Sequence, residues 1–150
     1  MTPVDLAVYA ILDPERTRGR PLDALADCAV RGGATILQLR DKHAGTRLFI
    51  ERAREIKAAI AGRIPFVIND RVDVALAAGV DGVHLGKEDM TAADARALLG
   101  PQAIIGLTLK DEGDVAGLDP RLVSYGCIGG VFPTVSKDNP AAPVGLGGLT

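Results

Sequence analysis

The feature that most constrains the fold is an alternation, along the whole chain, of short aliphatic runs with amphipathic stretches. Between residues 46 and 60, for example, apolar side chains recur at helical spacing and leave the charged side chains for the opposite face. Strands that alternate with helices in this way imply parallel βα units joined by right-handed crossovers. The predicted strands are residues 6–12, 34–40, 64–70, 81–86, 103–109 and 122–130, and the predicted helices are residues 21–33, 46–60, 72–79 and 91–100, with another short helix before the last strand.

Two α/β architectures satisfy this alternation: an open doubly wound sheet, and a (β/α)8 barrel of which only part is present. Periodicity alone does not choose between them. The chain has 150 residues, enough for one domain with a core, and only 3% of them are aromatic. Its apolar content therefore comes mainly from aliphatic residues and alanine, as in folds that pack aliphatic strands against Ala-rich helices. We treat residues 1–150 as a single domain.

The charge balance excludes some classes of partner. Seventeen basic and 19 acidic residues are interspersed and give a net charge of -2, so there is no basic surface for nucleic acid or an anionic membrane. A small-molecule partner is favoured. No apolar run is long enough to span a bilayer and the first residues do not resemble a signal peptide, so we expect a cytoplasmic protein. Cys28 and Cys127 stand alone in apolar segments and are expected to be reduced, buried thiols.

Polar residues follow the predicted strands at the edge where parallel α/β folds place their ligands. The second strand ends with Gln38, Arg40 and Lys42 at alternate positions, with leucines between them. Because side chains alternate along a strand, two cations and an amide converge on one face. An ordinary charged exit from a strand would have the same pattern.

Two further strand ends carry carboxylates. The third strand ends with Asn69 and Asp70, and Asp89 follows the fourth strand. Neighbouring strands lie about 4.8 Å apart, so Asp70 and Asp89 could approach each other above the sheet. Oxygen ligands without His or Cys suit Mg2+, which takes one or two carboxylates and completes its shell with water and phosphate. Each aspartate also precedes a predicted helix, and a pair of helix caps is the alternative interpretation.

The last strand ends supply hydroxyl groups and another cation. The fifth strand carries Thr108, and the loop after the sixth contains Thr134, Ser136 and Lys137. Together with the basic residues of the second strand and a metal site, these groups describe a pocket for a polyphosphate, and a pyrophosphate fits best.

Four separated segments also resemble a known family. "LQLRDK" (37–42), "INDRVDVALAAGVDGVHLGKED" (68–89), "IIGLT" (104–108) and "GGVFPTVSKD" (129–138) are similar, in order and spacing, to thiamine phosphate synthase. That family is a (β/α)8 barrel of the TIM type. It joins 4-amino-2-methyl-5-hydroxymethylpyrimidine diphosphate to 4-methyl-5-(2-phosphoethyl)thiazole and releases pyrophosphate with Mg2+ present. The resemblance implies the same fold and the same transferase activity.

The resemblance also implies roles for the polar strand ends. Asp70 and Asp89 match the family's Mg2+ ligands, and Arg40, Lys42 and Lys137 match the cations expected to act on the pyrophosphate. The substrate-binding set that it implies is Gln38, Arg40, Lys42, Asn69, Thr108, Thr134, Ser136 and Lys137. The chain departs from the family pattern at Asp41, Lys87 and Gly130, where Glu, Gln and Pro are usual, and at Thr108, where Ser is common. None of these departures removes a ligand.

A complete barrel of this type usually needs about 200 residues or more, and six strands are visible here, so we expect only about the first six βα units. Such an arc has two unpaired edges, and self-association through them is an open alternative. For these residues alone we expect weakened diphosphate binding and little synthase activity. A truncated homologue that only binds phosphorylated thiamine precursors is the main rival. A thiazole tautomerase is less favoured, because the whole acidic and basic set is intact.

Overall fold

The six predicted strands form one parallel sheet. The computed structural model describes residues 3–133 and 143–149. The strands pair in the order β1-β2-β3-β4-β5-β6, which is also their order along the chain. Their bounds are β1 (Tyr9–Leu12), β2 (Ile36–Leu39), β3 (Phe66–Asn69), β4 (Gly82–Leu85), β5 (Ile104–Leu109) and β6 (Tyr125–Ile128).

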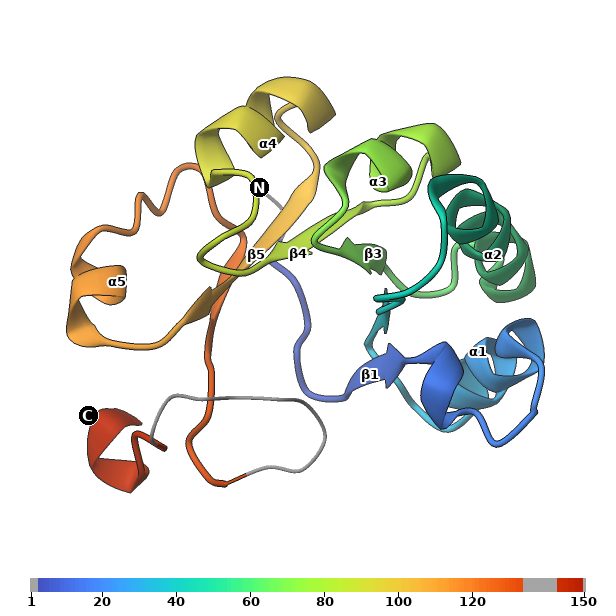
Figure 1. Cartoon of the computed structure of the whole chain (residues 1–150), viewed down its shortest axis with the longest axis horizontal. Coiled ribbons are helices and arrows are strands. Elements are labelled where there is room, and N and C mark those ends of the chain that lie inside the picture. Colours follow the sequence, from blue (N-terminus) through green and yellow to red (C-terminus); the bar gives the residue numbers. More distant parts are fainter. Residues whose placement is uncertain (1–2, 134–142, 150) are drawn as a thin grey trace.

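The strand order decides between the two architectures. A doubly wound sheet reverses its strand order at a switch point, whereas a barrel adds each strand beside the previous one. Here the order never reverses, and Figure 1 shows the helices around the outside of a curved sheet. The chain therefore forms a half-barrel of the (β/α)8 type, as predicted.

The helices follow the strands as expected. The described helices are α1 (Leu22–Arg31), α2 (Thr46–Ile60), α3 (Val72–Ala78), α4 (Ala92–Leu99) and α5 (Glu112–Ala116), with short 3-10 turns η1 (Pro14–Arg16) and η2 (Leu146–Leu149). Gly79 ends α3 in the left-handed conformation, with a φ of 65°. In the part of the chain that the structure describes, no helix has the length and apolar character to cross a membrane.

The core lies between the outer face of the sheet and the helices. Leu37 and Leu39 of β2 are fully buried and belong to the same cluster as Phe49 and Ile56 of α2. Burying each such side chain contributes about 1.5–3 kcal/mol. Because the leucines of β2 point outward into this core, the side chains between them point to the concave face.

The concave face and the two sheet edges are less covered. Each edge strand, β1 and β6, has a single neighbour in the sheet, and Ile11 of β1 is 55% exposed. The expectation of two buried thiols is wrong, because Cys28 and Cys127 are both exposed. Cys127 lies on the edge strand β6, where no further strand of the described chain covers it.

Candidate active site

A cavity of about 580 Å3 occupies the concave face and reaches the carboxyl ends of the strands. Four predicted residues from three strand regions line it, namely Gln38, Arg40, Asn69 and Thr108. The same cavity is lined by Tyr9, Asp13, His84 and Tyr125, which the sequence did not indicate as ligands. The fold therefore brings both predicted amides, one cation and one hydroxyl group to one space, whereas Lys42, Asp70 and Asp89 do not line it.

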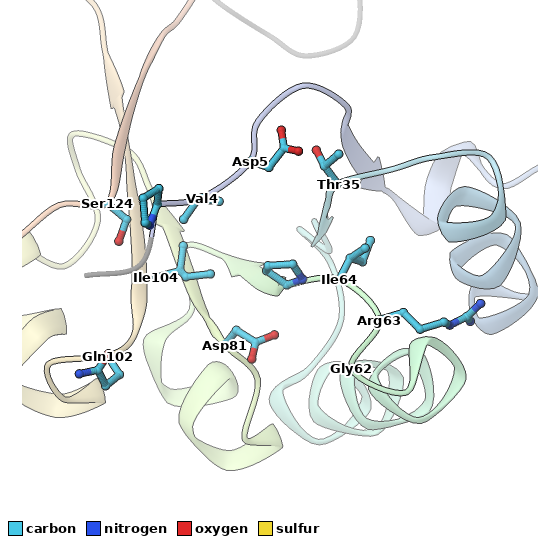
Figure 2. A pocket seen from close by; sticks show the side chains of 12 residues that line it. Val4, Asp5, Thr35, Gly62, Arg63, Ile64, Asp81, Gln102, Ile104 and Ser124 are labelled. Carbon is cyan, nitrogen blue, oxygen red and sulfur yellow. The ribbon is translucent and has the colours of Figure 1, made fainter.

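A second cavity, of about 490 Å3, lies at the opposite, amino ends of the strands (Figure 2). Its polar side chains hold the backbone in place. Asp81 accepts from the Phe66 amide at 2.8 Å, and Ser124 accepts from the Ile105 amide at 3.1 Å. Because barrel enzymes act at the carboxyl end of the sheet, we assign this cavity a structural role.

Strand β2 places two predicted ligands on the concave face. Gln38 is only 3% exposed, and its Nε2 donates to the Tyr9 hydroxyl at 2.9 Å. Arg40 follows β2 and donates from Nη1 to Asp13 Oδ2 at 2.7 Å. The other oxygen of Asp13 accepts from the Glu15 amide, so this carboxylate both begins η1 and orients the guanidinium.

Lys42 lies beyond the end of β2 and contacts the carboxylate of the next strand. Its Nζ forms an ion pair with Asp70 Oδ2. Asp70 has a φ of 63° and donates its backbone N–H to the carbonyl oxygen of His84 on β4. The unusual backbone angle and this cross-strand bond hold the Asp70 carboxylate at the strand end.

The helix-cap alternative is wrong for both aspartates. Arg71, not Asp70, precedes α3, and its side chain makes no capping bond. Thr91 caps α4 by accepting from the Asp94 amide at 3.1 Å. Asp89 instead accepts from the Gly86 amide at 2.7 Å, within the loop that follows β4. Neither carboxylate caps a helix.

Asp70 and Asp89 meet as the neighbouring strands suggested. Partial burial, and then the nearby Asp70 carboxyl, raise the pKa of Asp89 above its usual value, and Lys42 opposes that shift. Two carboxylates that repel each other beside a cation form a donor set that suits Mg2+. Among the described residues, no group of three or more His, Cys, Asp or Glu side chains is placed to share a metal. A cation here would therefore take two protein carboxylates and fill its shell with water or phosphate oxygens.

The loop that carries Arg40 and Lys42 is fixed by the residue between them. Asp41 has a side chain only 5% exposed, which pairs with Arg52 of α2. Its other oxygen accepts from the Ala44 amide at 3.0 Å. Asp41 thus ties the loop to the helix that follows it.

The comparisons with known proteins place this arrangement in a family. Residues 8–150 match the family model described as thiamine monophosphate synthase. The chain belongs to this family. It is 54% identical to the thiamine-phosphate synthase of Agrobacterium fabrum over the whole of this chain and 69% of that relative. It is 49% identical to the enzyme of that name from Xanthobacter autotrophicus over 95% of this chain and 68% of that relative.

Solved structures agree with the thiamine monophosphate synthase assignment. The thiamine phosphate pyrophosphorylase from Pyrococcus furiosus superposes with a TM-score of 0.79 at 32% identity, over 95% of this chain and 67% of that one. A structure of PhdJ bound to a substrate intermediate, 16% identical with a TM-score of 0.57, shares the fold alone. The chain thus spans about two thirds of the length of these family members.

Some family positions lie outside the described residues. These are Thr134, Ser136 and Lys137, the hydroxyl and lysine groups predicted for the loop after β6. Lys87, which stands where the family commonly has Gln, donates to Asp114 of α5 at 2.8 Å. It therefore links the loop after β4 to α5.

The sequence did not indicate four cavity residues as ligands: Tyr9, Asp13, His84 and Tyr125. Asp13 orients Arg40, and the two tyrosine hydroxyls lie 2.7 Å apart although 116 residues separate them in sequence. The available signal was that the two tyrosines of the chain both lie in predicted strands. Only the curvature of the sheet shows that they meet.

Proposed function

We propose that this member of the thiamine monophosphate synthase family acts as a transferase on small-molecule substrates in the cytoplasm. It would join the pyrimidine diphosphate to the thiazole phosphate and release pyrophosphate. The observation that carries the proposal is the cluster of Lys42, Asp70 and Asp89 at adjacent strand ends, with Arg40 two residues before Lys42 and paired with Asp13. A metal-bound diphosphate requires cations for its oxygens and carboxylates for the metal, and the cluster together with Arg40 supplies two of each.

The cations would act on the leaving group. Cleaving the bond between the pyrimidine methylene carbon and the pyrophosphate builds negative charge on the departing oxygens. Arg40, already oriented by Asp13 at 2.7 Å, presents a planar donor fork to those oxygens. Lys42 supplies a point charge beside Asp70, and Lys137 would add a third cation. Charge placed where it develops in the transition state is typically the largest catalytic term.

Asp70 and Asp89 would hold Mg2+. When bound, the ion would neutralise phosphate charge and so stabilise the leaving group. Lys42 now neutralises part of the charge of the aspartate pair, and its flexible side chain can turn toward phosphate oxygens instead. Because the two carboxylates are partly buried and repel each other, they favour the binding of a cation in place of Lys42.

The second substrate would need positioning rather than activation. The electron-rich aminopyrimidine stabilises positive charge on its methylene carbon, and the thiazole nitrogen already carries a lone pair. The chain's task is therefore to align the two, which accounts for a site without a clear general base. Gln38 and Asn69 would hold the pyrimidine, Thr108 would add a hydroxyl contact, and Thr134 and Ser136 would meet the thiazole phosphate.

A second candidate, binding without turnover, is favoured by one observation. Strands β1 and β6 are open edges, and the chain spans about two thirds of its relatives. Diphosphate binding needs only the groups at the ends of β2, β3 and β4 and does not need a closed barrel. Self-association through the edges would provide another way to cover them.

Turnover separates these functions. The purified chain is incubated with both substrates and Mg2+, pyrophosphate and thiamine phosphate are quantified, and light scattering records the molar mass. The synthase proposal expects both products, and their loss in Asp70→Ala and Asp89→Ala. Asp119→Ala, which changes a half-buried carboxylate that pairs with Arg121 before β6, is the matched control. Diphosphate binding without any pyrophosphate release would instead support the binding function.

A further inference from the structure

The turn that carries Asp89 is closed by two hydrogen bonds of its own. Within this turn, residues 86–89, Asp89 Oδ2 accepts from the Gly86 amide at 2.7 Å, and the Asp89 amide donates to the Gly86 carbonyl oxygen at 3.3 Å. A Cβ at Gly86 would lie 3.0 Å from the same carboxylate oxygen, so the turn leaves little room for a side chain there. Both bonds lie within the turn, so they give it a shape and do not fix it against its neighbours.

Lys87, at the tip of this turn, joins it to the next βα unit. Its Nζ donates to Asp114 Oδ1 of α5 at 2.8 Å and lies 3.7 Å from Asp111 Oδ2. The side chain of Asp111 is 59% exposed and that of Asp114 only 14%, so Asp114 is both the closer and the better shielded partner. The ion pair therefore ties the turn after β4 to the helix that follows β5.

Asp114 is itself held in place. Its Oδ2 accepts from the Lys110 amide at 2.9 Å, and its own amide donates at 2.8 Å to Asp111 Oδ1, the cap of α5. The hydrogen bonds from Lys87 and from the Lys110 amide lower the pKa of Asp114, so this carboxylate is charged at neutral pH. An ammonium and a backbone N–H can only donate to it, so the direction of each bond is defined. Asp114 thus gives Lys87 a fixed and negatively charged anchor.

The anchor lies close to groups that the proposed function uses, but outside the cavity of the concave face. A separate cavity of about 290 Å3 between the loop after β4 and α5 is lined by Lys87, Asp89, Thr108 and Asp114. Asp114 does not line the cavity of the concave face. It can therefore affect a ligand there only through the residues that it holds.

We propose that Asp114 is a positioning residue for the metal site: through Lys87 it fixes the turn that presents Asp89, and so raises the affinity of the Asp70 and Asp89 pair for a divalent cation. The inference rests on the proposed function, since it takes the metal from there. Without a cation, the repulsion between the two carboxylates acts to move the Asp89 turn away from Asp70. An anchored turn resists that movement, and less reorganisation then accompanies binding.

The positioning can be measured without any metal, by NMR detection of deuterium exchange at the Gly86 amide. This amide donates to Asp89 Oδ2, so its protection reports where the carboxylate lies. We expect about 5-fold faster exchange in Asp114→Ala and in Lys87→Ala, an effect of the size of a partly exposed ion pair. The double variant should exchange no more than about 2-fold faster than either, because both changes break the same contact. Unchanged exchange in the single variants, or effects that add in full, would overturn the inference.

The affinity is measured with Mn2+ as the probe, since carboxylate and water ligands suit it as they suit Mg2+. Its binding is followed by the relaxation of water protons. We expect binding about 5-fold weaker in Asp114→Ala than in the wild type. Glu112→Ala is the matched control, because it removes an exposed carboxylate from the same helix and Glu112 is not a partner of Lys87. Equal affinities in the two variants would overturn the inference, because the loss of a negative charge near the site would then explain the whole effect.

Chemical denaturation separates positioning from a general loss of structure. Asp114→Ala and Glu112→Ala should unfold at similar denaturant concentrations, although their affinities for Mn2+ differ. If Asp114→Ala does not fold, Lys87→Ala, which changes a side chain that is 54% exposed, decides the exchange measurement. If the wild type binds no Mn2+, the proposed metal site is refuted, and the exchange of the Gly86 amide still decides whether Asp114 positions Asp89.

Discussion

At the scale of single residues, the carboxylates of the site are placed to bind a cation, and this placement lowers the stability of the metal-free fold. Asp89 is partly buried beside Asp70, and both features raise its pKa above the ordinary value of 3.8. Lys42 pairs with Asp70 and relieves only part of the repulsion. Functional sites commonly hold such perturbed carboxylates, because the arrangement that binds the ligand destabilises the unliganded fold.

The stability of the metal-free protein should therefore depend on pH through Asp89. A raised pKa means that the folded state holds this proton after the unfolded state has lost it, so stability falls as pH rises from 3.8 through the folded pKa. The Asp89→Asn variant has no carboxyl group at this position, so it does not lose stability in this way as the pH rises. Its Tm minus that of the wild type should increase with pH, by roughly 1–3 °C between pH 3.5 and 7 in a chelator. A difference that stays flat, or decreases with pH, would show that Asp89 is not perturbed in this way.

At the scale of elements, the close packing of β4 against β5 depends on one glycine. A Cβ at Gly82 would lie 1.8 Å from the carbonyl oxygen of Ile104, a backbone atom that cannot move without breaking the pairing of the two strands. Since β4 carries His84 and leads to Asp89, this contact also positions the site.

Gly82→Ala should consequently destabilise the fold by about 3 kcal/mol or more, at the upper end of the cost of core overpacking, because the clash is with backbone. Gly45→Ala is the matched control, because a Cβ there meets no atom within 4 Å and the backbone lies in an allowed region. Chemical denaturation of both variants measures the effect. Equal stabilities for the two variants would mean that β4 and β5 are not packed this closely.

The elements also show which parts of the fold could be predicted from the sequence. Helix α2 is predicted to its terminal residues, because its apolar spacing and charged face leave no other period. The alternation of Gln38 and Arg40 with leucines correctly predicts which face they share. The Tyr9 to Tyr125 contact could not be predicted, since it depends on the curvature that brings two edge strands together. The exposure of Cys127 likewise follows from its place on an edge strand, which an apolar local sequence does not reveal.

At the scale of the whole molecule, the half-barrel is covered unevenly. Central strands have neighbours on both sides and helices over their outer face, whereas β1 and β6 each have one neighbour. The residues of β3 are mostly buried, and those of β6 are intermediate or exposed. Regions with few buried contacts open at the lowest free energy.

Hydrogen exchange should therefore separate the strands. We expect the slowest exchange in Phe66–Asn69 and much faster exchange in Tyr125–Ile128, measured by mass spectrometry on the full chain. The difference should persist on dilution if the edges are open. If a second copy covers the β6 edge, the two segments should instead be equally protected at high concentration, and the protection of Tyr125–Ile128 should be lost on dilution.

The proposed function depends most on whether the strand ends form one metal-diphosphate site. Titration calorimetry of the pyrimidine diphosphate with and without Mg2+ tests it directly, on the wild type and on Asp70→Ala, with Asp119→Ala as control. We expect binding that requires Mg2+, is lost in Asp70→Ala by at least about 10-fold, and is retained in the control. Binding of equal strength in a chelator and in Asp70→Ala would show that no metal-diphosphate site exists here, because the carboxylates would then have no part in holding the ligand.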